Sequence, residues 1–299
     1  MDDFIIGDYD FSPVSEKKAK SKKSFQAKKL LPGMRKAEKR LMLLQYQTWQ
    51  RLVGDKLVFA PVSFSGDQRI LEVATGAGFW MLDVASQLPK SVAIHGIDRS
   101  SRYFPKQHPS NVSFSTCSAT ALPFSWAGYF DFAHQRFLSL SMTNPEWKAA
   151  LAELYRVTKP GGWVQIGEVY PAFPEGKHGV KQKAIFYAVS KARGLDLDIP
   201  LQLERHLSAA GFVDVRVEES YGHCGASHGT QGQTYKGRML ALTKAMRSEV
   251  LQAGGFGVVE SKQEYEEMMK GLEKEYDESG CTICLFTCIA KKPHPDFAV

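Results

Sequence analysis

The sequence predicts an α/β fold built on a doubly wound, mostly parallel sheet. Between residues 69 and 169, short runs of apolar residues alternate with longer segments of helical periodicity. Strands that alternate with helices in this way are typical of a parallel sheet. With 43% hydrophobic and 23% charged residues in a chain of 299, the composition is that of a globular protein large enough to bury a sizeable core.

The chain before this region predicts a helix over 37–57, where apolar residues recur at helical spacing. The alternating region then predicts five strands and two helices. The strands are expected at 69–74, 92–97, 112–115, 129–133 and 163–169. The helices are expected at 79–88 and 145–157, and a Pro-Gly-Gly segment at 160–162 stops the second one.

Beyond Pro171 the pattern changes to longer helical segments. We expect helices at 176–193, 200–211, 238–253 and 264–278, a strand at 212–218, a Gly- and His-rich loop at 222–237, and a closing strand at 281–290. This order predicts one domain over 31–299. Its core would be 67–170, its substrate-cap segments 171–211 and 221–262, and its closing helix and strand 263–299.

The formal net charge of +6 is concentrated at the N-terminus. Residues 1–40 contain eleven Lys and Arg but six Asp and Glu, so the rest of the chain is nearly neutral. Such a basic run is typical of a nuclear-localisation or nucleic-acid patch, or of a solvated, disordered arm. We favour a disordered arm at 1–30, because no aromatic stacking pattern accompanies the charge. The near-neutral body argues against nucleic acid as a partner.

The apolar stretches and the cysteines of the sequence indicate whether the chain spans a membrane, in which compartment it lies and whether it binds a metal. The longest apolar stretch, 281–290, is about half of the ~20 residues that cross a bilayer, so we expect no membrane span. Without an apolar leader, and with five cysteines, an odd number, the chain is expected in the cytoplasm, or in the nucleus if the basic run directs it there. Cys281-x-x-Cys284 lacks a second pair, and strand alternation separates its thiols, so we expect no metal site.

A glycine loop ends the first expected strand, directly before a helix. Gly76 and Gly78 allow a sharp turn and close approach of the backbone to a ligand. Met81 stands where a dinucleotide motif has its third glycine, and its bulk would hinder close helix–strand contact. Asp98 ends the second strand, where a carboxylate accepts hydrogen bonds from both ribose hydroxyls. The pattern predicts nucleoside binding at the carboxyl edge of the sheet rather than a plain turn and a surface Asp.

Five segments follow one another in the alternating region: Ile70-Leu-Glu-Val-Ala-Thr-Gly-Ala-Gly-Phe-Trp80, His95-Gly-Ile-Asp98, Leu122-Pro-Phe124, Phe130-Asp-Phe-Ala-His-Gln-Arg136 and Leu154-Tyr-Arg-Val-Thr-Lys-Pro-Gly-Gly-Trp163. Their order and spacing resemble the successive motifs of class I S-adenosylmethionine-dependent methyltransferases. Upstream, Leu44-Gln-Tyr-Gln-Thr-Trp49 and Lys56-Leu-Val-Phe-Ala-Pro61 resemble the LaeA-like group of fungal secondary-metabolism methyltransferases. The resemblance implies a Rossmann-like seven-stranded sheet with a helical cap insertion. It also implies S-adenosylmethionine as cofactor and S-adenosylhomocysteine as product.

The resemblance assigns a set of cofactor-binding residues by position. The set is Glu72, Ala74, Gly76, Gly78, Asp98, Arg99, Ser118, Ala119 and Gln135. Within it, Glu72 would lie near the methionine amino end, Asp98 would hold the ribose hydroxyls, and Arg99 would flank the adenine. Ser118 and its neighbour would sit at the adenine edge, and Gln135 would line the cofactor near the sulfonium.

Three residues depart from the family pattern. Ala74 replaces the first glycine of the loop, where a methyl group is tolerated if φ is negative. Ser118 stands where an acidic residue commonly accepts a hydrogen bond from the adenine amino group, and a hydroxyl accepts more weakly than a charged group. Tyr46 stands where the LaeA-like group often has His.

His134, Glu168 and Tyr46 are the candidates for catalysis. The first two lie near the carboxyl ends of strands, and Tyr46 lies on the helix before the sheet. A general base adds about 10²–10⁴-fold when the nucleophile must lose a proton. For a histidine, a buried structural role is the alternative.

These features predict methyl transfer to an oxygen or nitrogen of a small, fairly apolar secondary metabolite. Two other functions fit the same features: a LaeA-like nuclear regulator that binds cofactor and protein partners, and a methyltransferase fold reused for a non-methylating reaction. A homo-oligomer also stays open. Aromatic residues of the cap segments either line the acceptor pocket or pack in the core. They are Tyr170, Phe173, Phe186, Tyr187 and Tyr221.

Overall fold

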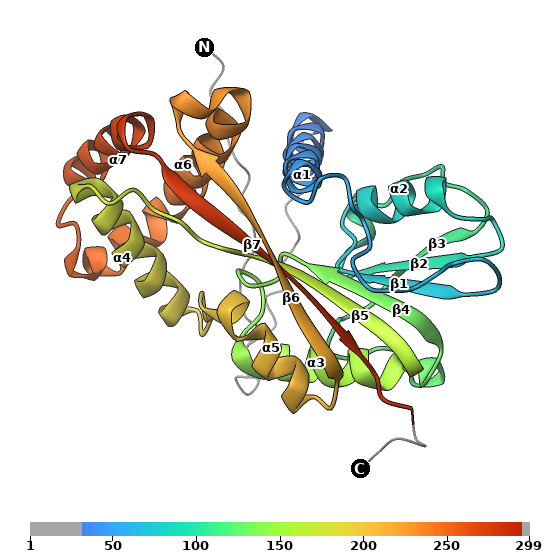
Figure 1. Cartoon of the computed structure of the whole chain (residues 1–299). Helices are drawn as coiled ribbons and strands as arrows, with labels where there is room; N and C mark the ends of the chain where they lie inside the picture. The colour runs from blue at the N-terminus through green and yellow to red at the C-terminus, as the bar shows by residue number, and fades with distance from the viewer. Residues whose placement is uncertain (1–31, 295–299) are drawn as a thin grey trace.

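The computed structural model describes residues 32–294, so the expected disordered arm at 1–30 lies outside the described residues. The described chain forms a seven-stranded sheet with the strand order β3-β2-β1-β4-β5-β7-β6 (Figure 1). The first five strands in this order are parallel, and β7 runs antiparallel to both β5 and β6. The expected α/β class, with a doubly wound, mostly parallel, Rossmann-like sheet of seven strands, is confirmed.

The elements have the following bounds. The strands are β1 Arg69–Val73, β2 Ala93–Asp98, β3 Val112–Thr116, β4 Phe130–Arg136, β5 Thr158–Tyr170, β6 Val213–Cys224 and β7 Cys281–Lys291. The α-helices are α1 Pro32–Leu52, α2 Phe79–Gln87, α3 Asn144–Val157, α4 Lys177–Ala192, α5 Ile199–Ala209, α6 Gly229–Gln252 and α7 Lys262–Glu278.

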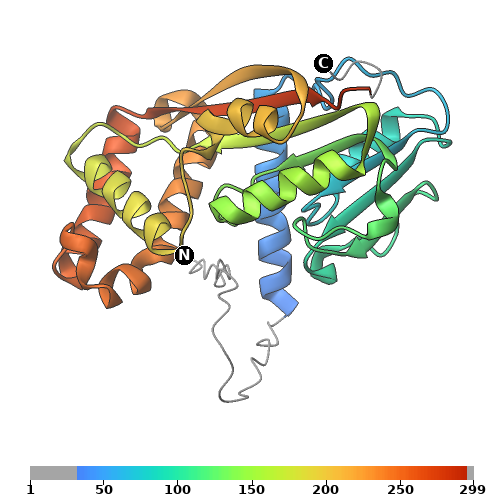
Figure 2. The same ribbon diagram turned by 90° about the horizontal axis from the view of Figure 1, so that it is seen from below.

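Helices cover both faces of the sheet because each central strand alternates two apolar sets. On one face, α3 and α5 pack against residues such as Ala133 and Ile166. On the other face, α1 and α2 pack against residues such as Ile70 and Phe132. A third cluster joins α4, α6 and α7 beyond the end of the sheet. Figure 2 shows α1 between this helical group and the first strands, so it borders both parts of the molecule.

Several of the expected element boundaries are wrong. The helix expected at 37–57 runs from Pro32 to Leu52, and the strand expected at 163–169 already begins at Thr158. The segment 222–237 is not a loop, since β6 continues to Cys224 and α6 begins at Gly229. Three of its glycines, Gly222, Gly225 and Gly232, are packing residues; a Cβ on Gly232, for example, would lie 2.3 Å from the Gly225 carbonyl oxygen. Strand β4 runs to Arg136 rather than to residue 133, because β1 and β5 pair with it on both sides and satisfy its backbone.

The contact between α2 and the sheet depends on Gly96 of β2. A Cβ on Gly96 would lie 2.4 Å from Met81 Sδ and 3.1 Å from Thr75 Cγ2. The missing side chain is therefore on the strand rather than on the helix, and the bulk of Met81 does not hinder close approach. Our expectation for Met81 was wrong for this reason.

The Gly96→Ala variant should lower the free energy of unfolding by about 1–3 kcal/mol, the usual cost of overpacking a core. Gly237, in the exposed part of α6, has no atom within 4 Å of the position of a Cβ. As a matched control, Gly237→Ala should be neutral or stabilise by up to about 1 kcal/mol. Urea denaturation of both variants measures the difference, and equal midpoints would contradict the assigned contact.

Candidate active site

The loops that follow β1, β2, β3 and β4 surround a cavity of about 440 Å³, the first cavity. This volume lies within the range of small-molecule sites. Helix α1 closes one side of it, and the start of α3 contributes Glu146. Seven of the residues singled out from the sequence line it: Tyr46, Ala74, Gly76, Asp98, Arg99, Ser118 and Ala119.

Asp98 fixes the glycine loop against the end of β2. Its Oδ2 accepts a hydrogen bond from the Gly76 N–H at 2.9 Å, and its Oδ1 accepts one from the Ser100 N–H at 3.1 Å. Burial raises the pKa of this carboxyl, and the backbone donors oppose the shift. Because each carboxylate oxygen has two lone pairs, Asp98 can still accept bonds from a diol in the cavity.

The glycine loop is left-handed at three positions. Gly76 and Gly78 have φ of +56° and +74°, and a Cβ on Gly78 would lie 2.9 Å from the Phe114 ring. Ala74 also has a positive φ of +56°. The condition for tolerating its methyl group, a negative φ, is therefore not met, and the residue carries a strain of about 1–2 kcal/mol.

The loop after β3 forms the far wall of the first cavity with Cys117, Ser118, Ala119 and Thr120. The Ser118 hydroxyl lies 2.8 Å from Thr120 Oγ1 and also accepts a hydrogen bond from the Thr120 N–H at 3.3 Å. Its acceptor capacity is thus already used in part. Arg99 is exposed at this edge.

Gly78, although it belongs to the glycine loop, does not line the first cavity. Three other residues singled out from the sequence are buried and do not line it either: Glu72, His134 and Gln135. The Glu72 carboxylate accepts a hydrogen bond from the Thr75 hydroxyl. The His134 ring stacks on Trp80 at 3.8 Å, and its Nδ1 lies 3.7 Å from Glu72 Oε1. Burial lowers the pKa of His134 to about 4, so this ring is neutral near pH 7.

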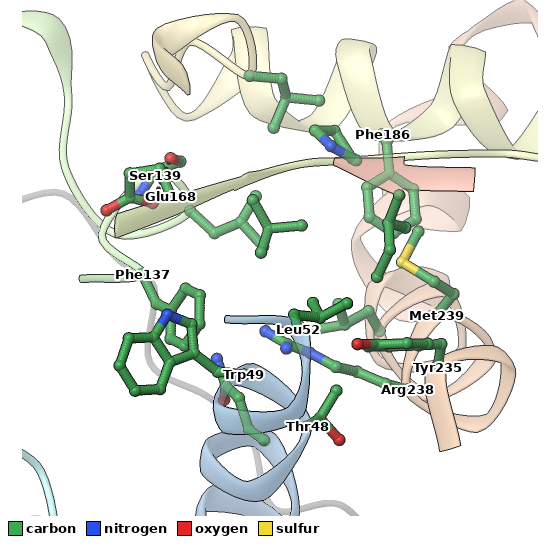
Figure 3. A pocket seen from close by; sticks show the side chains of 17 residues that line it. Thr48, Trp49, Leu52, Phe137, Ser139, Glu168, Phe186, Tyr235, Arg238 and Met239 are labelled. Atoms are coloured by element: carbon green, nitrogen blue, oxygen red, sulfur yellow. Dashed lines mark hydrogen bonds between the residues drawn. The ribbon is translucent and has the colours of Figure 1, made fainter. Parts of the chain in front are cut away.

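Figure 3 shows the lining of a second cavity, of about 90 Å³. This cavity adjoins the first, because Gln45 and Phe137 line both. Its other walls come from α1, α4 and α6 and from the ends of β5 and β7. Most of its lining is apolar, and its polar members are Gln45, Thr48, Ser139, Glu168, Tyr235 and Arg238.

Glu168, near the end of β5, lines the second cavity and is buried. Its carboxylate accepts hydrogen bonds from the Leu138 N–H at 2.7 Å, the Ser139 N–H at 3.1 Å and the Ser139 hydroxyl at 2.6 Å. Figure 3 shows Ser139 beside the carboxylate. Burial raises the pKa of Glu168 to about 7, and these donors limit the rise. The group therefore changes charge near neutral pH.

The hydroxyl of Tyr46 is bound to Asp83 of α2. The hydroxyl donates to Asp83 Oδ2 at 2.6 Å, and Gln50 Nε2 donates to the same oxygen at 3.0 Å. Burial and this carboxylate raise the pKa of Tyr46. Its ring, not its hydroxyl, faces the Arg136 guanidinium at 4.8 Å.

Several residues that line the first cavity were not predicted from the sequence. Arg102 and Tyr103, shortly after Asp98, both donate to Glu38 of α1, Arg102 at 2.8 Å, and so connect α1 to the loop after β2. Arg136 was quoted within a motif but given no role. Two weak signals pointed to these residues: Arg102 and Tyr103 closely follow Asp98, and Arg136 ends β4. Their interaction partners are distant in the chain, so spacing along the sequence could not assign their roles.

The aromatic residues of the cap segments divide between pocket and core. Phe186 lines the second cavity. The ring of Phe173 packs against the ring of Phe186, with 5.2 Å between the ring centres. The hydroxyls of Tyr170 and Tyr187 lie 3.2 Å apart, whereas Tyr221 is exposed on β6.

The described residues contain neither a metal-ligand cluster nor a membrane-spanning helix. Between residues 32 and 294, no three His, Cys, Asp or Glu side chains gather as a metal site would require. None of the described helices is both long and apolar enough to span a bilayer.

A Rossmann-like sheet with a glycine loop after β1 and an acidic residue at the end of β2 defines a nucleoside-binding α/β protein. Comparisons with known proteins refine this class. Residues 70–162 match a family model described as a methyltransferase domain. The N-methyltransferase tcpN of Claviceps purpurea is 30% identical over 247 residues, which cover 79% of this chain and 88% of that protein.

Two other relatives match shorter segments. The N-methyltransferase verN of Clonostachys rogersoniana is 35% identical over 42% of this chain and 45% of its own length. The N-methyltransferase gliN of Aspergillus fumigatus is 36% identical over 44% of this chain and 47% of its own length. The chain belongs to the S-adenosylmethionine-dependent methyltransferases.

The residues of the first cavity fit that cofactor. The cavity is large enough for a nucleoside with an amino-acid chain, Asp98 retains acceptor capacity for a ribose, and the glycine loop permits close approach. A Cβ on Gly76 or Gly78 would extend from a left-handed backbone that other residues rarely adopt.

The Asp98→Ala variant should bind S-adenosylhomocysteine about 10- to 150-fold more weakly, since hydrogen bonds to a charged group contribute about 1.5–3 kcal/mol. Calorimetric titration measures this loss. Asp67, in the loop before β1 and outside both cavities, provides a matched control, and Asp67→Ala should bind like the wild type. Unchanged affinity in folded Asp98→Ala would contradict the assignment of the ribose site.

Proposed function

We propose that this chain transfers the methyl group of S-adenosylmethionine to a nitrogen atom of a small, largely apolar secondary metabolite. The observation that carries the proposal is the apolar second cavity, which meets the first cavity at Gln45 and Phe137. The choice of nitrogen over oxygen is supported by the relatives from Claviceps, Clonostachys and Aspergillus, all named N-methyltransferases.

The cofactor, when bound, supplies a methyl group already activated on a sulfonium. The task of the chain is therefore mainly to bring the nucleophile into line, and proximity alone contributes roughly 7–11 kcal/mol. The second cavity suits this task because Leu52, Phe186 and Met239 give it apolar walls. Trp49 Nε1, buried in the same wall without a hydrogen-bond partner, is available to a polar atom of the acceptor.

We propose Glu168 as the group that receives the proton from the nucleophile. It lines the second cavity, and a base works best when its pKa lies near the working pH, as the value of about 7 does here. His134 and Tyr46 are not proposed for this role. The His134 ring lines neither cavity, and the Tyr46 hydroxyl is bound to Asp83.

Matched acceptors test the choice of atom. The wild-type protein is incubated with S-adenosylmethionine carrying a ¹³C-methyl group and with an apolar aniline or the phenol of the same skeleton. The carbon chemical shift distinguishes N–CH₃ from O–CH₃ products. Methylation of the nitrogen compound supports the proposal. Exclusive methylation of the phenol would overturn the nitrogen assignment and leave methyl transfer intact.

The pH dependence of kcat tests the role of Glu168. A base must be ionised to accept a proton, so kcat should fall about tenfold per pH unit below an apparent pKa of about 7. This fall is the acidic limb of the pH profile of kcat. Ser139→Ala removes a donor that stabilises the carboxylate, so the acidic limb should move to higher pH by about one unit. Glu168→Gln should lose the limb and about 10²–10⁴-fold in kcat.

Ser141→Ala is the control for this series, because Ser141 lies in the same loop and no hydrogen bond joins it to Glu168 in the described chain. Its limb should stay at the wild-type pH. A limb that does not move in Ser139→Ala would assign the titration to another group.

A further inference from the structure

Arg136, the last residue of β4, lies inside an aromatic cage at the junction of the two cavities. Its guanidinium carbon lies 4.8 Å from the ring centre of Tyr46, 4.9 Å from that of Trp49 and 5.5 Å from that of Phe137. The side chain lines the first cavity, and its Nη1 is buried without a hydrogen-bond partner. The cage holds a cation and leaves one of its donors unused.

No carboxylate of the described chain pairs with this guanidinium at ion-pair distance. Burial lowers the pKa of the Arg136 guanidinium, and the carboxylates of Glu72 and Asp83 oppose this shift from beyond ion-pair distance. Both already accept other hydrogen bonds, from Thr75 and from Tyr46. Since a buried charge is costly unless it is paired, the site is suited to an anion that the chain itself does not supply.

The other two arginines of the first cavity differ from Arg136. Arg99 is exposed to solvent, and Arg102 donates to Glu38 at 2.8 Å. Of these three cations, Arg136 alone combines a buried, unused donor with the absence of a paired carboxylate. An anionic group in the first cavity would therefore find its strongest partner at the end of β4.

The strand order determines which part of the cofactor reaches this point. Across the carboxyl edge, β3, β2, β1 and β4 are neighbours in that order. Ser118, after β3, and Asp98, at the end of β2, both line the first cavity, where the expected placement puts the adenine and the ribose. A chain that continues in the same direction crosses the glycine loop after β1 and arrives at Arg136. The group at that end of the cofactor is the amino acid, which carries a carboxylate.

We infer that Arg136 binds the α-carboxylate of the amino-acid part of S-adenosylmethionine. It thereby acts as a positioning residue that keeps the sulfonium over the glycine loop, beside the entrance to the second cavity. The inference deepens the proposed function and rests on it for the place of the cofactor in the first cavity, not for the identity of the acceptor.

Two ligands that differ by this one group test the inference. S-Adenosylhomocysteine and its decarboxylated analogue are titrated calorimetrically into wild type, Arg136→Gln and Arg136→Lys. Wild type should prefer the carboxylate ligand by about 10- to 150-fold, the range for hydrogen bonds to a charged group. Arg136→Gln should bind the two ligands equally within about threefold, and Arg136→Lys should recover part of the preference because it retains the charge.

Arg102→Gln is the matched control, since it removes another cation of the same cavity. It should keep the wild-type preference even if both affinities fall. Equal weakening of both ligands in Arg136→Gln, with the wild-type preference retained, would show a purely structural role and overturn the inference. So would a preference that persists in Arg136→Gln while KM for the acceptor rises, which would assign the cage to an anionic acceptor.

The outcomes separate this inference from the proposed function. A wild type that shows the carboxylate preference but methylates only the phenol retains the Arg136 assignment and loses the nitrogen assignment. A wild type that methylates the aniline but does not distinguish the two ligands retains the nitrogen assignment and loses the Arg136 assignment.

Discussion

The packing of α1 against the ends of β4 and β5 is the contact on which both cavities depend. Trp49 lies against β5 at Gly167, where a Cβ would lie 3.7 Å from the indole nitrogen, an ordinary contact distance. The Tyr46 hydroxyl binds Asp83 and so attaches the same helix to α2. One helix thus contributes walls to both the first and the second cavity, and a small shift of α1 would change the two together.

The buried ionisable side chains near this contact have different surroundings. These differences distinguish a structural role from a role in binding or chemistry. Glu168 is held by three donors of one loop, yet burial still raises its pKa to about 7. His134 is neutral and stacked on Trp80, which is a core role. Arg136 has aromatic faces but no carboxylate partner within the described chain. Only Glu168 and Arg136 also line a cavity, which is why the proposals concern these two.

The sequence predicted the features that depend on neighbouring residues. The strand–loop–helix at Gly76 and Gly78 and the acid at Asp98 were readable because each motif is local. The position of His134 was not readable, because the strand was predicted to end at residue 133, three residues before its actual end. Alternation along a β4 that reaches Arg136 puts His134 inside the sheet contact with Trp80. Tyr46 was the one residue of α1 that the sequence indicated. The contribution of this helix to the second cavity could not be predicted, since it depends on contacts far apart in the chain.

The two cavities divide the work of the reaction between different kinds of interaction. The first is defined by backbone shape and charge, with the Asp98 carboxylate and the left-handed loop from Ala74 to Gly78 setting its floor. The second is defined mainly by apolar side chains, which select by size and exclude water. An activated methyl group needs little further chemistry, so exclusion of water and alignment matter most. Under the proposed function, a carboxylate with a pKa near 7 in a mostly apolar wall would be sufficient to remove one proton from the acceptor.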